Sequence, residues 1–136
     1  MSGEFFVDTS AWYPLVVASH PDHAKLARTL RARIRDGRRV VTTNLIVAET
    51  HALLMRRASI PAALQFARTI GDPPNVVVRS SEELETRAIR DWLEPYDDHD
   101  ISLADAVSFA VMSERKIDEV LALDHHFTSA GFRVAP

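Results

Sequence analysis

The stretch Phe5-Phe6-Val7-Asp8-Thr9-Ser10 decides the fold class of this chain. Its three consecutive apolar residues predict a short strand buried on both faces, and a carboxylate follows them at once. Ser10 can cap the helix that we expect to run to about Ser19, with Pro14 tolerated in its first turns. A buried strand that passes directly into a helix is typical of a parallel α/β sheet.

The rest of the chain repeats this alternation of short apolar runs with longer helical patterns. We expect further strands at residues 39–42, 76–78, 120–123 and 132–134. We expect further helices from Pro21 to Gly37, from Asn44 to about Arg57, from Pro61 to Gly71, from Ser80 to about Tyr96 and from Ser102 to near Lys116. The pattern predicts an α/β fold: a central, mostly parallel sheet of about 4–5 strands flanked by 6–7 helices.

The starts of three of these helices carry cap residues. Asn44 and Ser102 can each accept a hydrogen bond from the first turn of the helix that follows. Ser80 together with Glu83 has the spacing of a capping box.

Length and composition favour one domain over residues 1–136. With 46% hydrophobic and 26% charged residues, the chain has the composition of an ordinary globular protein. The absence of cysteine excludes disulfides, thiolate zinc sites and cysteine nucleophiles. No stretch approaches a membrane span and the N-terminus has no signal-like pattern, so we expect a cytoplasmic protein without membrane contact.

Charge is distributed unevenly along the chain, although the net charge is only −3. Residues 1–68 hold 10 Lys and Arg against 5 Asp and Glu, whereas residues 69–136 hold 6 against 14. Much of the basic excess lies in the arginines at positions 28, 31, 33, 35, 38 and 39. Such a run can contact phosphates, but it can equally solvate the outer face of a helix.

Four acidic residues stand in apolar settings where a carboxylate is costly without a partner. Asp8 and Asp124 each follow an apolar strand, and the carboxyl ends of parallel strands line the ligand crevice. Asp105 lies in the first turn of the helix that begins after Ser102. Glu49 has apolar residues three and four positions away on both sides, so we expect it on the apolar face of its helix.

Each of these acids also has a purely structural explanation. Asp8 and Asp105 can complement a helix dipole, Asp124 can form a turn, and Glu49 can form a buried ion pair with Arg56 or Arg57. As a set, however, the four can converge on one crevice. Two like charges about 4 Å apart repel by roughly 4 kcal/mol at an effective dielectric constant of 20, so such a crevice requires cations. Oxygen ligands favour Mg²⁺ or Mn²⁺ over Zn²⁺.

Several motifs, taken together, resemble PIN-domain ribonucleases, and more narrowly the VapC toxins of bacterial toxin–antitoxin pairs. These motifs are Phe6-Val7-Asp8-Thr9-Ser10, Asn44-Leu45-Ile46-Val47-Ala48-Glu49, Ser102-Leu103-Ala104-Asp105-Ala106, Leu123-Asp124-His125-His126-Phe127 and Ala130-Gly131-Phe132. They occur in the order of the family and span nearly the whole chain. None is specific alone, and the combination carries the resemblance.

The resemblance implies a reaction and a role for each acid. Asp8, Glu49, Asp105 and Asp124 align with the catalytic quartet of the family, with Asp8, Asp105 and Asp124 as ligands of Mg²⁺ or Mn²⁺, directly or through water. Ser10 aligns with the hydroxyl that supports the first acid, and Ser102 supports Asp105 as the cap of its helix. The implied reaction is metal-dependent hydrolysis of RNA by an activated water, leaving 5′-phosphate and 3′-hydroxyl ends.

Two features qualify the match. Many members have Thr or Ser two residues before the last acid, where this chain has Ala122, so a hydroxyl near the metal is missing. No separate general base stands out, and we interpret His51, His125 and His126 as peripheral helpers.

The resemblance also implies a homodimer and a small VapB-type antitoxin. Two other functions stay open at this stage. One is a DNA-directed nuclease of the wider PIN superfamily, although the chain lacks the length for DNA-clamping elements. The other is a binding module without catalysis, whose acidic cleft captures an Arg-rich peptide.

Overall fold

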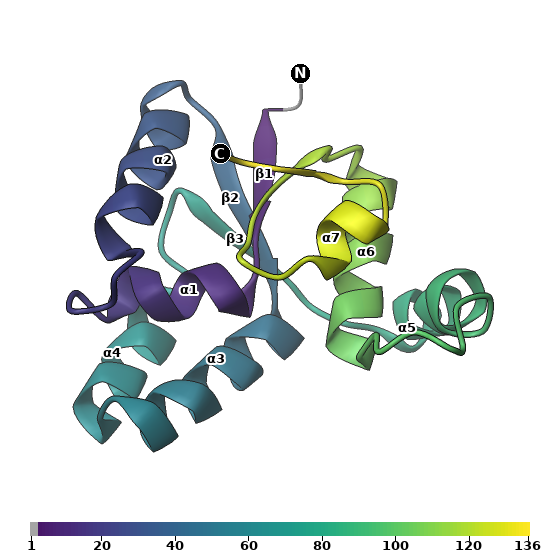
Figure 1. The fold of residues 1–136 in the computed structure, drawn as a ribbon, viewed down its shortest axis with the longest axis horizontal. Helices are drawn as coiled ribbons and strands as arrows, with labels where there is room; N and C mark the ends of the chain where they lie inside the picture. The colour runs from purple at the N-terminus through teal and green to yellow at the C-terminus, as the bar shows by residue number, and fades with distance from the viewer. Residues whose placement is uncertain (1–2) are drawn as a thin grey trace.

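A five-stranded, fully parallel sheet forms the centre of the computed structural model, which describes residues 3–136 (Figure 1). The strands are β1 (Glu4–Val7), β2 (Arg39–Thr43), β3 (Asn75–Val78), β4 (Glu119–Leu121) and β5 (Arg133–Val134), in the order β3-β2-β1-β4-β5. The chain thus builds outward from β1 to β3 and then crosses back to place β4 on the other side of β1. This reversal creates a topological switch point between β1 and β4, where parallel sheets form crevices.

Helices cover both sides of the sheet. The helices are α1 (Thr9–Val16), α2 (His23–Arg35), α3 (Asn44–Arg57), α4 (Ile60–Thr69), α5 (Glu82–Ala88), α6 (Leu103–Arg115) and α7 (His126–Ser129), together with the π-helix η1 (Ile89–Leu93). In Figure 1, α1 to α4 lie on one side of the strands and α5 to α7 on the other. The predicted parallel α/β class is confirmed, with the short α7 as an element that the sequence patterns did not indicate.

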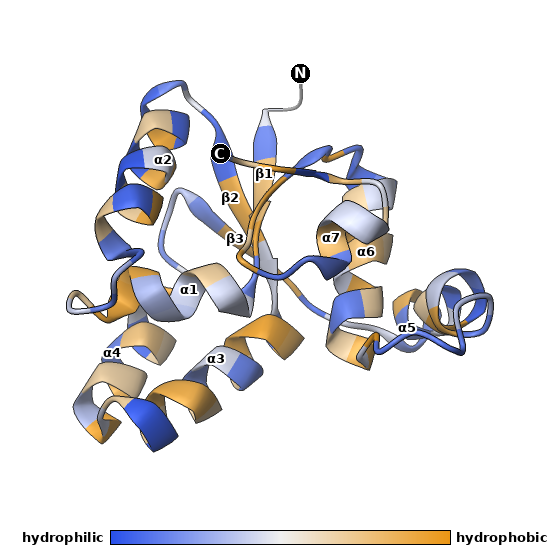
Figure 2. Cartoon of the chain, in the orientation of Figure 1, coloured by the Kyte–Doolittle hydropathy of each residue, from blue (hydrophilic) through white to orange (hydrophobic). Residues whose placement is uncertain are grey.

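The core is built on β1. Phe5, Phe6 and Val7 are at most 1% exposed, which explains why this strand is apolar at every position after the first. Phe6 packs against Phe127, which in turn lies edge-on to Phe109 of α6. In Figure 2, hydrophobic colour runs along β2 and also marks parts of α3, α4 and α6, whereas α2 carries much hydrophilic colour.

Helix α1 begins earlier than predicted, and its cap is Asp8 instead of Ser10. The Asp8 carboxylate accepts a hydrogen bond from the backbone N–H of Ser10, and the backbone of Asp8 is still extended. Asp8 is therefore the single residue between the strand and the helix. As a result, its position is fixed by the end of β1 on one side and by the first turn of α1 on the other.

Two other predicted caps are displaced by one residue. Thr43, and not Asn44, caps α3 by accepting from the N–H of Ile46. Ser81, and not Ser80, caps α5. The displaced residues have other partners: the side-chain oxygen of Asn44 accepts from the N–H of Ser80 at 2.7 Å, which joins the two helix starts.

The long helix predicted from Ser80 to Tyr96 is interrupted. It consists of α5 and the π-helix η1, in which the N–H of Glu94 donates to the carbonyl of Ile89. The wider turn places Trp92 against Phe109, with ring centroids 5.0 Å apart. Tertiary packing of this side chain accompanies the irregular turn, which periodicity alone does not indicate.

Arginines, three of them from the basic run, pair with two buried glutamates at the amino edge of the sheet. Glu119 of β4 accepts hydrogen bonds from Arg33 at 2.7 Å and from Arg38 at 2.8 Å. Glu4 of β1 pairs with Arg115 and Arg39. The hydrogen bond from Arg33 lowers the pKa of Glu119, and that from Arg115 lowers the pKa of Glu4. These arginines thus hold the sheet, a role that neither sequence interpretation of the run included.

No helix within residues 3–136 has the length and hydrophobicity that a membrane span needs.

Candidate metal centre at the carboxyl edge of the sheet

Asp8 occupies the switch point between β1 and β4. Its side chain is buried, and Oδ2 accepts hydrogen bonds from the Ser10 N–H at 3.1 Å and the Ser10 hydroxyl at 2.8 Å. Burial raises the pKa of the Asp8 carboxyl to about 6. The two Ser10 hydrogen bonds oppose this rise, and the charges of Asp105 and Glu49 add to it. Asp8 is therefore a buried carboxylate whose ionised form a nearby cation would stabilise.

Ser10 joins the ends of the two central strands. While its hydroxyl donates to Asp8, the same oxygen accepts a hydrogen bond from the N–H of Leu123 at 2.9 Å. The N–H of Asp8 also donates to the carbonyl of Leu121 at the end of β4. Ser10 thus fixes the segment that leads into Asp124. This segment has no hydroxyl two residues before Asp124, because residue 122 is alanine.

Asp105 reaches the same region from the start of α6. As predicted, Ser102 caps this helix: its hydroxyl accepts from the Asp105 N–H at 3.1 Å, and the Asp105 carboxylate accepts from the Ser102 N–H at 3.3 Å. Burial raises the pKa of Asp105, and the neighbouring charge of Asp124 acts in the same direction. Hydrogen bonds from Ser102 and the charge of His126 act against it.

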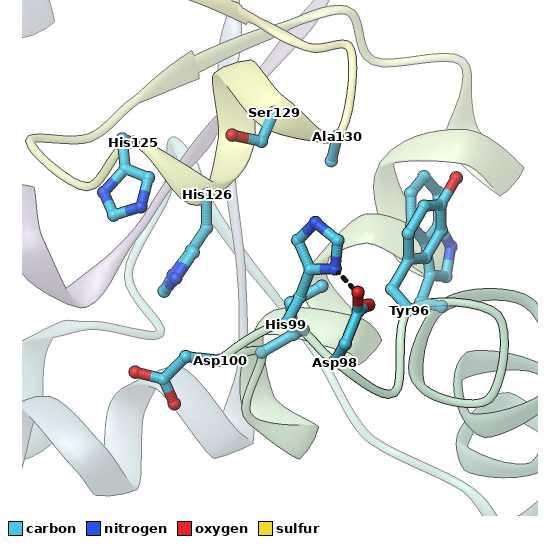
Figure 3. A pocket seen from close by; sticks show the side chains of 10 residues that line it. Tyr96, Asp98, His99, Asp100, His125, His126, Ser129 and Ala130 are labelled. Atoms are coloured by element: carbon cyan, nitrogen blue, oxygen red, sulfur yellow. Dashed lines mark hydrogen bonds and ion pairs between the residues drawn. The ribbon is translucent and has the colours of Figure 1, made fainter.

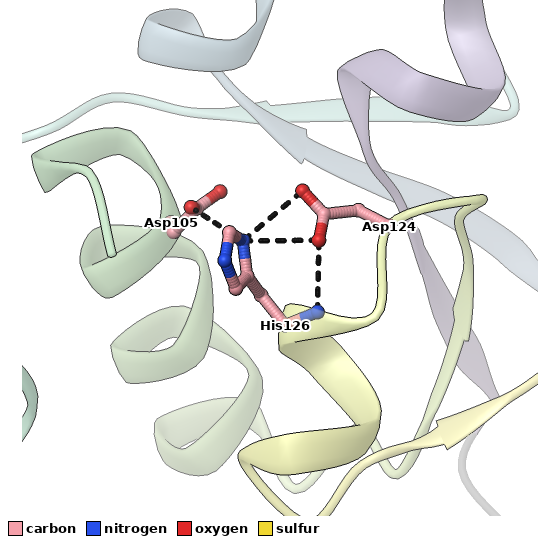
Figure 4. A group of neighbouring side chains, drawn as sticks. All are labelled: Asp105, Asp124 and His126. Atoms are coloured by element: carbon pink, nitrogen blue, oxygen red, sulfur yellow. Dashed lines mark hydrogen bonds and ion pairs between the residues drawn. The ribbon is translucent and has the colours of Figure 1, made fainter. Parts of the chain in front are cut away.

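His126 lies between two of the predicted acids (Figure 4). Its Nδ1 is 3.0 Å from Oδ1 of Asp124 and 3.4 Å from Oδ2 of Asp105, while its backbone N–H donates to Asp124 Oδ1 at 2.8 Å. The interpretation of His126 as peripheral is therefore wrong. The spacing Asp124-x-His126 at the start of a helix was the available signal, because an aspartate there bonds the N–H two residues on.

The other two histidines differ in position. His125 is largely exposed, with Nδ1 3.9 Å from Asp124 Oδ1. His51 is half-buried on α3, and within residues 3–136 it forms no ion pair.

Glu49 is not on the apolar face of its helix, contrary to the sequence-based expectation. The buried positions of α3 are Ile46, Thr50 and Leu54, each four residues from the next, and Glu49 is exposed. One residue of offset rotates a side chain by about 100° around a helix. Glu49 nevertheless lies close enough for its charge to raise the pKa of Asp8, so it borders the site from the solvent side.

The donor set fits a divalent cation. Asp105, Asp124 and His126 each offer one atom, and these atoms lie within 4.8 Å of one another. Among the residues from 3 to 136, only His125 and His126 lie within ion-pair distance of the carboxylates of Asp8, Asp105 or Asp124. The cluster consequently retains negative charge that no arginine or lysine neutralises, unlike the amino edge of the same sheet.

The fold and this cluster together define a class of α/β proteins that gather carboxylates for a metal ion at the carboxyl edge of a parallel sheet. The chain belongs to the PIN-domain family, whose sequence model matches residues 5–133. It is 35% identical over 127 residues to the 23S rRNA-specific endonuclease VapC20 of Mycobacterium tuberculosis, strains CDC 1551 and H37Rv, covering 93% of this chain and 94% of that protein.

A solved structure supports the same relationship. The crystal structure of Mycobacterium tuberculosis VapC20, described as a sarcin–ricin loop cleaving toxin, matches this chain with a TM-score of 0.86 and 34% identity. The match covers 94% of this chain and 95% of that one. The resemblance to VapC toxins and the predicted PIN fold are therefore confirmed.

Proposed function

We propose that this protein is a toxin of the VapC type that hydrolyses RNA phosphodiester bonds with a divalent cation. The observation that carries the proposal is the cluster of Asp105, Asp124 and His126 beside the buried Asp8 in a PIN fold. The similarity to an rRNA endonuclease over nearly the full chain favours this function over a non-catalytic binding module. It also favours RNA over DNA as the substrate.

Each residue has a part that follows from its position. Asp8, Asp105 and Asp124 hold the cation, for which Mg²⁺ is the best candidate and Mn²⁺ a substitute, because carboxylate oxygens suit hard ions. When bound, the ion supplies Lewis-acid activation of water and stabilisation of charge on the phosphate. Glu49 faces solvent at the rim, where its carboxylate can accept a hydrogen bond from an attacking water.

The remaining side chains orient these groups. Ser10 fixes Asp8 through its hydroxyl, and Ser102 fixes the backbone that carries Asp105. His126 spans Asp105 and Asp124 and either offers Nδ1 to the ion or holds both carboxylates in place. Hydrogen bonds to ligand side chains of this kind set their orientation.

The substrate that we propose is a loop of 23S rRNA, because the relatives named above act there. We also propose a VapB-type antitoxin and a homodimer as partners. The homodimer is supported by exposed apolar side chains on α3 and α4, namely Met55, Ile60 and Leu64. Surface of this kind is enriched where copies of a chain associate.

The test is cleavage of an RNA hairpin with the sarcin–ricin sequence, with Mg²⁺ or with EDTA, by the purified protein and by Asp105→Asn. We expect discrete 5′-phosphate ends that require both Mg²⁺ and Asp105. A DNA hairpin of the same sequence is the control for substrate class. Equal products from both proteins, or products that persist in EDTA, would contradict the proposed reaction.

A further inference from the structure

A cavity of about 280 Å³ opens beside the acidic cluster, and the proposed hydrolysis makes no use of it. Its walls come from two segments that are distant in sequence, residues 92–101 and 125–130 (Figure 3). His126 lines this cavity and also contacts Asp105 and Asp124. A group bound in the cavity is therefore a direct neighbour of the proposed metal site.

Two aromatic rings form one wall of the cavity. Tyr96 stacks on Trp92 with ring centroids 6.1 Å apart and an angle of 22° between the ring planes. Trp92 is held from behind by Phe109 and Phe132, whereas Tyr96 is 42% exposed. The pair is thus a supported and accessible flat surface, which is what a planar ligand needs for stacking.

Polar groups surround this surface. The ring of His99 stands edge-on to Tyr96, with centroids 5.6 Å apart, and its Nδ1 lies 2.8 Å from Oδ1 of Asp98. Asp100 and Ser129 also line the cavity. The carboxylates repel phosphate but accept hydrogen bonds from the N–H groups of a base edge. The lining therefore suits an uncharged planar group with hydrogen-bond donors.

We propose that this cavity binds one unstacked nucleobase of the RNA, beside the phosphodiester that is cut, with Tyr96 as the stacking residue. The inference rests on the proposed function and deepens it, because it assigns the residues that select the cleavage position. Proteins that recognise RNA loops commonly stack splayed bases on aromatic side chains and bind their edges by hydrogen bonds. The edge of the base would lie beside His99 and the neighbouring carboxylates, which line the same cavity.

An arginine side chain of an inhibitory peptide is the other group that an aromatic and acidic cavity can accept. The location favours the base. His126 connects the cavity to the carboxylates where the cut phosphate lies in the proposed reaction, and a nucleotide carries its base and its phosphate as one unit. The peptide is retained as an outcome of the test.

The test pairs protein variants with altered RNA. After the cut in the hairpin is mapped, each flanking nucleotide is replaced in turn by an abasic one, and single-turnover cleavage is measured. For the wild type we expect one abasic position to slow cleavage roughly five- to hundredfold, the range for loss of one stacked base. Tyr96→Ala should cut intact RNA more slowly by a similar factor. Its cleavage rate should not fall further on the RNA that is abasic at that position. Tyr96→Phe should behave as the wild type.

Ile89→Ala is the matched control, because Ile89 lies in the π-helix that precedes Tyr96 in the chain, is 40% exposed and does not line the cavity. RNA affinity is measured as well, in the Asp105→Asn background with and without Tyr96→Ala. If Tyr96→Ala lowers the affinity for RNA although neither the wild type nor any variant cleaves it, the base pocket is supported and the proposed chemistry is contradicted.

Two results would overturn the pocket. In the first, Tyr96→Ala slows cleavage by the same factor on intact RNA and on every abasic RNA, so that no abasic position depends on Tyr96. The other is that Tyr96→Ala cleaves as the wild type does but binds an Arg-rich peptide more weakly, which would assign the cavity to a peptide.

Discussion

Asp8 illustrates how one buried carboxylate can destabilise a fold and still serve the function proposed for the site. Its folded-state pKa of about 6 is above its ordinary value of 3.8, so the folded protein binds a proton more readily than the unfolded chain. Without a divalent cation, the Asp8 contribution to the free energy of unfolding therefore falls as pH rises from about 4 to about 6. In the proposed function, this loss of stability at neutral pH accompanies the presence of a charged ligand for the cation.

This effect can be isolated with Asp8→Asn, which cannot ionise. In EDTA, the difference in unfolding free energy between the variant and the wild type should grow by about 2 kcal/mol in favour of the variant between pH 4.5 and pH 7. Urea denaturation at several pH values measures it. A difference that stays constant with pH would show that Asp8 titrates normally.

Ser10 gives a second prediction at this scale. Ser10→Ala removes the hydroxyl that donates to Asp8 and accepts from Leu123, whereas Ser10→Thr keeps a hydroxyl. Because such supporting groups orient metal ligands, we expect Ser10→Ala to weaken Mn²⁺ binding about ten- to hundredfold. Isothermal titration of both variants checks this. Equal affinity in Ser10→Ala and the wild type would exclude a supporting role.

At the scale of elements, the start of α6 couples helix stability to the position of Asp105. Ser102→Ala removes one half of the capping box and should lower the free energy of unfolding by about 1 kcal/mol. Ser81→Ala removes the cap of α5 in the same way but touches no acid of the cluster, which makes it the matched control.

Both variants should therefore lose similar stability, and only Ser102→Ala should also lose RNA cleavage. Urea denaturation and the hairpin cleavage assay measure the two effects. If Ser81→Ala lost as much cleavage as Ser102→Ala, the effect would be one of general stability.

Which elements could be predicted depended on how local their causes are. The apolar run in β1 and the helix cap at Ser102 are local patterns, and the structure confirms both. The side of α3 on which Glu49 lies was not predictable, because this helix has apolar residues on several of its faces. Only packing selects the row of Ile46, Thr50 and Leu54 as the buried one. The π-helix before Trp92 likewise accompanies contacts with residues far along the chain.

The candidate site shows the same division. Strand ends and a helix start identified Asp8, Asp105 and Asp124, since the topology of a parallel sheet brings such positions together. The bridging position of His126 depends on the path of the short α7, and the stacking of Tyr96 depends on η1. Neither path follows a periodic pattern.

At the scale of the whole molecule, the two edges of the sheet treat buried charge differently. At the amino edge, the lowered pKa of Glu119 contributes stability above about pH 4.5, which is lost as pH falls through the folded-state value. Glu119→Gln leaves the buried Arg38 without its carboxylate and should cost about 3–5 kcal/mol. Chemical denaturation at pH 7 measures this loss. A cost below about 1 kcal/mol would mean that the pair behaves as an exposed one.

At the carboxyl edge, a bound cation would relieve the remaining repulsion among the carboxylates, so metal should stabilise the whole fold. A ligand that binds only the folded state at 100 times its dissociation constant adds about 2.7 kcal/mol. We therefore expect Mn²⁺ to raise the melting temperature of the wild type and to leave that of Asp105→Asn nearly unchanged. Arg33→Met, which loses one arginine of the amino edge but leaves Arg38 on Glu119, should melt lower yet keep the full Mn²⁺ increment. If the Mn²⁺-induced rise in melting temperature shrank in Arg33→Met and persisted in Asp105→Asn, the cation would bind at the amino edge of the sheet instead of the carboxyl edge.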